Sequence, residues 1–311
     1  MHATRCTDLR TLCLNYTRLT NADTELLAGL GTACTRLQTL ELRGNRFSST
    51  GCRAVLEAVA LLPCLHSLDL SFNRMFPRTT AAPAVLVRGS FSTLKRLRLS
   101  ALRLGSWGTW WLRSILVHMH ALRELHIDRN EIDGTSMAML YAGMRSCTRL
   151  EILKLSYNYL GHAFPVGFGE LVPSYRHLAC LSLDRNFLTD RGVCALVHCV
   201  GSCASLRRLG LSYNALGNPA VMALVCGADA VCAEGDEVVV RQDIFPGLVQ
   251  LDLAGNLIMD FGAVMLAAWI EAREGVQRLF MVDNVVEAEG EEALAHAKAL
   301  RCQRHCAVEI L

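Results

Sequence analysis

Cysteine and histidine are the residues of this chain whose spacing first suggests chemistry, because both types bind zinc. Two groups have a spacing that would place them on one face of a helix: Cys194, His198, Cys199 and Cys203, and then Cys302, His305 and Cys306. A structural zinc site needs four ligands that converge in a tetrahedron. Cys203, however, lies three residues before a leucine, as Cys34 and Cys147 also do. This recurrence predicts small buried packing residues, so we expect no metal and no cofactor.

The motifs of common catalytic sites are missing from the sequence. There is no glycine-rich phosphate loop, no H-E-x-x-H and no nucleophile-elbow serine. The net charge is +2, which argues against a dedicated nucleic-acid binder or a basic membrane-binding surface. The hydrophobic share of 52% excludes wholesale disorder. We therefore predict a folded protein that is not an enzyme, with no catalytic residue and no nucleic-acid partner.

Targeting signals are also missing from the sequence. Fourteen cysteines among 311 residues are fewer than disulfide-stapled secreted scaffolds carry. The N-terminus has no apolar stretch typical of a secretory signal. The longest apolar run, over 261–270, has about ten residues and is too short to cross a bilayer. We expect a cytoplasmic protein without membrane insertion, and nuclear or cytoskeletal association stays open.

A repeat organises the whole chain. The pattern L-x-x-L-x-L-x-x-N-x-L occurs in ten copies, two of which lack the Asn. The copies begin at residues 9, 37, 65, 94, 122, 150, 178, 206, 248 and 276, and most successive copies are 28 residues apart. The fourth and sixth positions of each copy alternate with period two, so they point to one face of a short strand. The rest of each copy carries the apolar spacing of a helix.

This repeat resembles the leucine-rich repeat family, in its ribonuclease-inhibitor-type subclass with 28-residue units, over essentially the whole chain. The resemblance implies an α/β fold, a right-handed parallel β/α solenoid of about ten repeats with a concave sheet, in a single domain over 1–311. Prolines predict irregular connections in the third and sixth repeats, over 76–83 and 163–173. The eighth repeat carries an acidic insertion near 226–245, and 287–311 is a candidate C-terminal cap.

The asparagine of the repeat lies where the strand ends and the chain turns inward. A buried turn leaves backbone groups without partners, and an amide side chain offers both donors and acceptors. We therefore predict a structural asparagine ladder. Its members are Asn45, Asn73, Asn130, Asn158, Asn186, Asn214, Asn256 and Asn284. Thr17 and Leu102 replace the asparagine in two copies, so the fourth repeat should be locally irregular.

Ligands are expected on the concave face, where the third, fifth, seventh and eighth positions of the repeat vary. The fifth position is acidic in the early copies and basic in the middle copies. At the seventh and eighth positions, arginine and tyrosine alternate from copy to copy, which permits cation–π stacking. The simpler alternative is that neighbouring Asp and Arg pair with each other on a solvated rim. The predicted partner-binding residues are Glu41, Asp69, Phe72, Arg98, His126, Arg129, Lys154, Tyr157, Arg185 and Tyr213.

A rigid face with many variable side chains and no reactive constellation favours a non-catalytic scaffold that binds a protein partner of unknown identity. The alternative is a GTPase-activating protein similar to the Ran-GTPase activator, which would make a small GTPase the partner. Against it, this chain ends with Arg301, Arg304 and His305 instead of an acidic tail. A ubiquitin-ligase substrate receptor and an axonemal or basal-body scaffold are further alternatives.

Overall fold

The backbone follows the repeat, with one short strand at the start of each copy and a helix after most of them. The structure is a computed structural model that describes residues 6–73, 91–161, 168, 175–228, 240–304 and 308–311. The chain divides into two compact units, Met1–Lys154 and Leu155–Leu311. The predicted connections over 76–83 and 163–173 and most of the insertion near 226–245 lie outside the described residues, apart from Phe168 and a few residues at the ends of the insertion.

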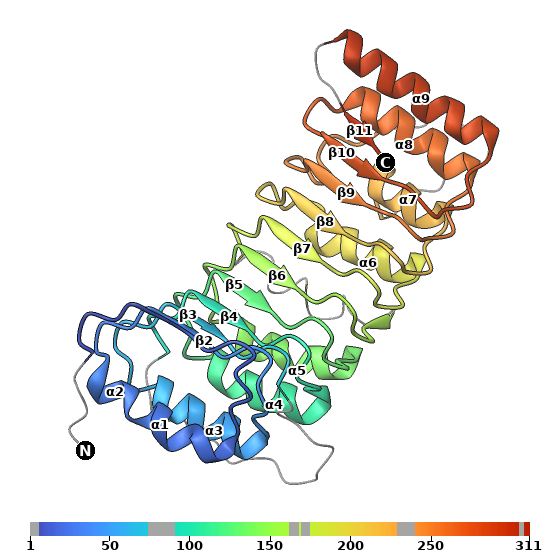
Figure 1. The fold of residues 1–311 in the computed structure, drawn as a ribbon. Coiled ribbons are helices and arrows are strands. Elements are labelled where there is room, and N and C mark those ends of the chain that lie inside the picture. Colours follow the sequence, from blue (N-terminus) through green and yellow to red (C-terminus); the bar gives the residue numbers. More distant parts are fainter. Residues whose placement is uncertain (1–5, 74–90, 162–167, 169–174, 229–239, 305–307) are drawn as a thin grey trace. The chain divides into compact units, whose positions relative to one another are not determined.

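The first unit holds six parallel strands in chain order (Figure 1). They are β1 Thr11–Cys13, β2 Thr39–Glu41, β3 Ser67–Asp69, β4 Arg96–Arg98, β5 Glu124–His126 and β6 Ile152–Lys154. The helices are η1 Asn21–Asp23, α1 Thr24–Ala28, α2 Leu30–Ala33, α3 Ser49–Val59, α4 Gly105–Leu116 and α5 Gly134–Met144. In this unit α1 packs on α3, and α4 packs on α5.

The second unit repeats this arrangement with five parallel strands in chain order. They are β7 Cys180–Ser182, β8 Arg208–Gly210, β9 Gln250–Asp252, β10 Arg278–Phe280 and β11 Glu309–Ile310. The helices α6 Asp190–Val200, α7 Asn218–Cys226, α8 Asp260–Ala272 and α9 Ala288–Gln303 pack successively on one another. The predicted α/β solenoid is therefore confirmed in both units. That they form a single domain stays a prediction.

The core lies between the strands and the helices of each unit. The middle residue of every strand from β1 to β10 is a leucine, and within each unit these leucines pair in register with one another. In repeats two to nine, the leucine or isoleucine two residues later is also buried, as are helix residues such as Leu112 and Leu196. Each repeat buries its apolar strand residues and its apolar helix residues against the neighbouring repeats. This burial stabilises a solenoid, because a single repeat cannot bury its own apolar surface.

Two buried arginines of the second unit donate hydrogen bonds to backbone carbonyls. Arg301 on α9 donates to the carbonyls of Ile270 at 2.9 Å and Val276 at 3.0 Å. Arg273, after α8, donates to the carbonyl of Phe245 at 2.6 Å and lies over the ring of Trp269. Helix ends leave carbonyl groups without intrahelical partners, and Arg301 supplies a donor at the C-terminal end of α8. Arg273 instead bonds the turn before β9.

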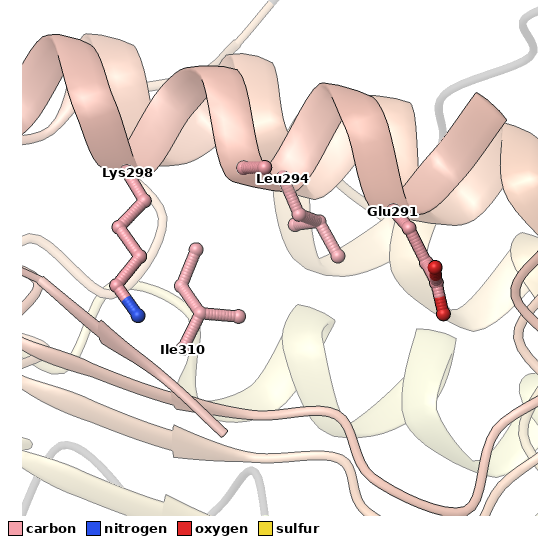
Figure 2. A pocket seen from close by; sticks show the side chains of 5 residues that line it. Glu291, Leu294, Lys298 and Ile310 are labelled. Carbon is pink, nitrogen blue, oxygen red and sulfur yellow. The ribbon is translucent and has the colours of Figure 1, made fainter. Parts of the chain in front are cut away.

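The candidate C-terminal cap consists of α9 and β11. Leu294 and Lys298 of α9 point toward Ile310 of β11, and together with Glu291 and Ala295 they line a shallow pocket (Figure 2). Its lining is part of the outermost repeat of this unit. None of the helices in the described residues is long and apolar enough to cross a membrane.

Candidate binding surface

The strand face is our name for the side of the sheet that the helices leave uncovered, formed by positions five, seven and eight of each repeat. At position five, strand pairing places the residues side by side. In the first unit the register runs through Cys13, Glu41, Asp69, Arg98, His126 and Lys154. In the second unit it runs through Ser182, Gly210, Asp252 and Phe280.

Position eight adopts the same unusual backbone conformation in all ten repeats. Each residue has a φ between +51° and +67°, in the left-handed region that residues other than glycine rarely adopt. The residues are Tyr16, Gly44, Phe72, Ala101, Arg129, Tyr157, Arg185, Tyr213, Gly255 and Asp283. The chain must turn sharply away from the strand at this point, so position eight forms a column at the edge of the strand face.

A tyrosine–arginine stack occupies this column in the second unit, formed by Tyr157, Arg185 and Tyr213. The guanidinium carbon of Arg185 lies 5.3 Å from the centre of the Tyr157 ring and 3.8 Å from that of Tyr213. The two tyrosines are 41% and 40% exposed. Tyr213 also donates a hydrogen bond of 2.9 Å to Asp283, which raises the pKa of its phenol. The cation is thus held between two rings that remain accessible.

Glycine makes room for this stack. A Cβ atom on Gly255 would lie 2.4 Å from the ring of Tyr213, so the ring covers the glycine of the next repeat. The first unit contains the same arrangement, since a Cβ on Gly44 would lie 2.3 Å from the ring of Tyr16. There Arg43 donates to the Tyr16 hydroxyl at 2.9 Å and lies 4.4 Å from the centre of the Phe72 ring. Phe72 is among the residues predicted from the sequence, whereas Tyr16 and Arg43 are not.

Asp184 is held by serines. Its carboxylate accepts hydrogen bonds from the hydroxyls of Ser156, Ser182 and Ser212 at 2.7–2.9 Å, and from the Ser212 amide at 3.0 Å. In the described part of the chain, no ion pair joins Asp184 to Arg185. The alternative of an Asp–Arg pair on a solvated rim therefore does not hold for this repeat. The serines instead fix the turn from which Arg185 projects.

Three basic side chains lie next to one another on β4, β5 and β6. Arg98, His126 and Lys154 are direct register neighbours. Partial burial, with Lys154 and Arg98 nearby, lowers the pKa of His126 to about 4, so its imidazole is neutral at pH 7. Arg98 comes within 3.6 Å of Glu124. The Nε atom of Arg98 and the Nε2 atom of His126 are buried without a hydrogen-bond partner.

The remaining predicted residues differ in their accessibility. Asp69 is only 6% exposed and accepts a hydrogen bond from the Ser71 amide at 2.8 Å, so it contributes little surface to the strand face. Its selection as a contact residue stays a prediction. Glu41 is half-buried and accepts from the Asn15 side chain at 2.7 Å. Arg129 is exposed.

The asparagines at position nine connect successive turns. Asn256, for example, accepts from the amides of Asn214 and Leu216 and donates to the carbonyls of Leu211 and Leu253. Asn45, Asn73 and Asn284 accept from a backbone amide and donate to two carbonyls in the same way. Further bonds of this type are made by Asn130, Asn158, Asn186 and Asn214.

The two repeats without asparagine differ from this pattern. Thr17 donates to the Leu14 carbonyl at 2.8 Å and to the Asn45 side chain at 3.2 Å. Leu102 is fully buried, and α4 begins one residue earlier in its repeat than α3 and α5 do. The Leu99 carbonyl still accepts from Asn130 at 2.8 Å, and the Leu70 carbonyl from Asn73 at 2.8 Å. Neighbouring asparagines thus keep these carbonyls bonded.

The cysteines and histidines do not assemble a metal site in the described residues, where no group of three possible ligands converges. His305 and Cys306 lie outside those residues. Burial raises the pKa of the Cys147 thiol to about 12, and that of Cys34 and Cys194 above the usual value. These thiols are therefore protonated at neutral pH and are poor nucleophiles.

Comparison with known proteins gives a consistent set of similarities. A family model described as Leucine Rich repeat matches residues 33–56 and 202–225. Ribonuclease inhibitor of Sus scrofa is 29% identical over 263 residues, which are 83% of this chain and 54% of that protein. The NACHT, LRR and PYD domains-containing protein 12 of Homo sapiens is 27% identical over 78% of this chain. Tonsoku-like protein of Mus musculus is 33% identical over 67%. This chain spans about half the length of ribonuclease inhibitor, and 22% and 16% of the other two.

Proposed function

Because this chain belongs to the leucine-rich repeat family, of the ribonuclease-inhibitor type, we propose that it is a scaffold that binds a protein partner through its strand face without catalysis. The relative from Sus scrofa is an inhibitor of ribonuclease, which is itself a protein. A parallel sheet backed by helices presents its outward side chains in fixed positions, which suits recognition of a large surface.

The tyrosine–arginine stack carries this proposal. Tyrosine and arginine are enriched among the residues that dominate binding energy in protein interfaces. Tyr157 and Tyr213 keep about two fifths of their surface exposed while they hold Arg185 between them. A side chain that is already ordered loses less conformational entropy when a partner binds. Asp184 has its oxygens occupied by serines, which supports a binding surface rather than a catalytic one.

The test compares proteins captured from a cell lysate by three forms of the chain. Tyr157→Ala with Arg185→Ala removes two members of the stack. Trp110→Ala with Arg113→Ala removes an exposed aromatic residue and an exposed arginine from α4, on the helix side of the first unit. We expect at least one protein to be retained by the wild type and the α4 variant, and to fall at least tenfold with the stack variant by quantitative mass spectrometry.

Stability must be measured in parallel, since loss of folding would also abolish capture. An exposed cation–π contact contributes about 0.5–1 kcal/mol, so the stack variant should melt within a few degrees of the wild type. Undiminished capture by the folded stack variant would refute partner binding through the tyrosine–arginine stack. The GTPase-activator alternative stays a prediction, and stimulation of GTP hydrolysis by Ran with catalytic amounts of this chain would favour it over a pure scaffold.

A further inference from the structure

A basic patch covers the strand face and its rim over β4, β5 and β6. It contains six permanently charged basic residues and three acidic ones. The basic members are Lys95, Arg96, Arg98, Arg123, Arg129 and Lys154, and the acidic members are Glu124, Asp128 and Glu151. Two acidic members are already engaged with arginines, because Glu124 lies 3.6 Å from Arg98 and Glu151 lies 2.5 Å from Arg123. The patch thus keeps a net positive charge although the whole chain is nearly neutral.

Two histidines lie beside the basic residues of this patch. The pKa of His66, next to β3, is lowered by partial burial and by Lys95 and Arg96. The pKa of His126 on β5 is lowered by partial burial and by Lys154 and Arg98. Nearby positive charge disfavours protonation of an imidazole. Both imidazoles therefore stand in a field that would favour an anion.

The centre of the patch also contains polar atoms with unused hydrogen-bonding capacity. Arg98 Nε and His126 Nε2 are buried and have no hydrogen-bond partner. A buried donor without a partner carries a free-energy cost, which an incoming acceptor can relieve. Arginine also offers a planar set of donors that matches a carboxylate. A carboxylate here would gain charge attraction and a hydrogen bond from Arg98, and a hydrogen bond from His126 when its imidazole carries a proton on Nε2.

The spacing of the patch indicates the shape of the ligand. Arg98, His126 and Lys154 are register neighbours on adjacent strands, and adjacent strands lie about 4.8 Å apart. An α-helix rises about 5.4 Å per turn. A helix laid across the strands would therefore place one acidic side chain per turn opposite each of the three basic residues.

From these observations we propose that the basic patch binds an acidic helical segment of the partner protein, with carboxylates opposite Arg98, His126 and Lys154. The proposal rests on the proposed scaffold function and specifies the partner's chemistry. A nucleic acid would also bring negative charge, but the acidic side chains within the patch oppose a continuous phosphate backbone. A protein segment can place its few carboxylates only where the basic residues lie.

The test uses a defined probe, a fluorescein-labelled helical peptide with Glu at positions i, i+4 and i+7 in an Ala/Gln background, at low ionic strength. The same peptide with Gln in place of Glu is the uncharged control. Arg98→Gln with Lys154→Gln should weaken binding of the acidic peptide at least tenfold. Arg113→Gln with Arg149→Gln removes equal charge from exposed positions on α4 and in the turn between α5 and β6 and should change binding less than twofold.

Three results would overturn the proposal. The first is equal binding of the acidic and uncharged peptides, and the second is equal loss of binding in the two double variants. The third is displacement of the peptide by single-stranded DNA, or by vesicles that contain anionic lipid, at lower concentrations than by unlabelled peptide. Folding of each variant is checked by circular dichroism, because Arg98 is partly buried.

A pH titration separates His126 from general charge attraction. His126 is faced by Arg98 from β4 and Lys154 from β6, and Glu124 and Asp128 lie on its own strand and just after it. A bound carboxylate would favour the protonated imidazole, so peptide binding should tighten several-fold as the pH falls from 7.5 to 5.5. His126→Gln should abolish this change, whereas His66→Gln should keep most of it. A flat profile in the wild type would remove His126 from the site.

The two proposals can fail separately. Loss of lysate capture in the stack variant together with no specific peptide binding would refute the acidic segment while keeping the scaffold. Specific binding of the acidic peptide, with lysate capture unchanged in the stack variant but lost in Arg98→Gln with Lys154→Gln, would move the partner site from the second unit to the first.

Discussion

The strand faces of the two units have the same backbone and different chemistry. In the first unit, position five carries charged side chains from Glu41 to Lys154. In the second unit the same position is Ser182, Gly210, Asp252 and Phe280, and the column at position eight contains the tyrosine–arginine stack. Leucines and asparagines that fix the backbone are common to both units. One set of repeat positions determines the backbone, and another set determines the side chains on the strand face. The chemistry of the surface can therefore vary without a change in the scaffold.

The asparagine ladder also differs between the units. In the first unit, Leu102 interrupts it, and the neighbouring Asn73 and Asn130 keep the affected carbonyls bonded. In the described repeats of the second unit every copy has its asparagine. The first unit thus tolerates a missing amide where α4 starts early, whereas the second unit has no such adjustment in its described helices.

Asn256→Leu should therefore produce the largest effect on stability. The substitution leaves the buried amides of Asn214 and Leu216 without their acceptor, and each orphaned group costs about 1–3 kcal/mol. We expect a loss of about 3 kcal/mol in the free energy of unfolding, measured by urea denaturation. Leu257→Asn, the reverse change at the adjacent exposed residue, should change it by less than about 0.5 kcal/mol. A denaturation midpoint unchanged by Asn256→Leu would contradict the role of the ladder.

Gly255→Ala tests whether the stack depends on the glycine that it covers. Gly255 has a φ of +64°, and a new Cβ would lie 2.4 Å from the Tyr213 ring. Left-handed strain costs about 1–2 kcal/mol for a residue with a side chain, and displacement of the ring adds to it. Gly161→Ala is the control, because Gly161 has a φ of +57° with nothing within 4 Å of the new Cβ.

Gly255→Ala should thus destabilise the chain more than Gly161→Ala does, and it should also weaken partner capture. Gly44 offers the same comparison in the first unit, with Gly105 as its control, since a Cβ on Gly105 would also meet nothing within 4 Å. If the two glycine substitutions in a unit lower the free energy of unfolding by the same amount, then the ring above the glycine contributes nothing to stability.

A further effect concerns the pH dependence of stability and arises from His126 in the first unit. The pKa of His126 is lowered from 6.5 to about 4 in the folded chain, so the unfolded chain binds a proton more readily. Stability from this group is fully present above pH 6.5 and declines as the pH falls from 6.5 toward 4. His126→Gln should make the fall in unfolding free energy over this window smaller. An identical pH dependence in the two proteins would show that His126 does not contribute.

Much of the fold could be predicted from the sequence, because a 28-residue period places each leucine without knowledge of any contact. The register of leucines such as Leu40, Leu68 and Leu97 confirms that frame. The buried arginines Arg273 and Arg301 could not be predicted, since charged residues are ordinarily exposed and nothing in the pattern marks the carbonyls that they satisfy.

The candidate surface was only partly predictable, because the repeat pattern does not specify the contacts between neighbouring side chains. Alternation of arginine and tyrosine indicated the stack of Arg185 and Tyr157, but Tyr16 with Arg43 escaped notice because the pattern there is not repeated in the next copy. Asp69 was selected by its position in the frame, and neighbouring side chains decided its burial. The role of the selected residues in partner binding stays a prediction.

The left-handed backbone at position eight restricts which mutations this column can accept during evolution or design. Valine, isoleucine and threonine are strongly disfavoured in that conformation, and none of the ten repeats has one of them there. A combinatorial library that diversifies the strand face should therefore omit these three amino acids at position eight. Fully random codons at those sites would fill the library with clones that misfold before any selection for binding begins.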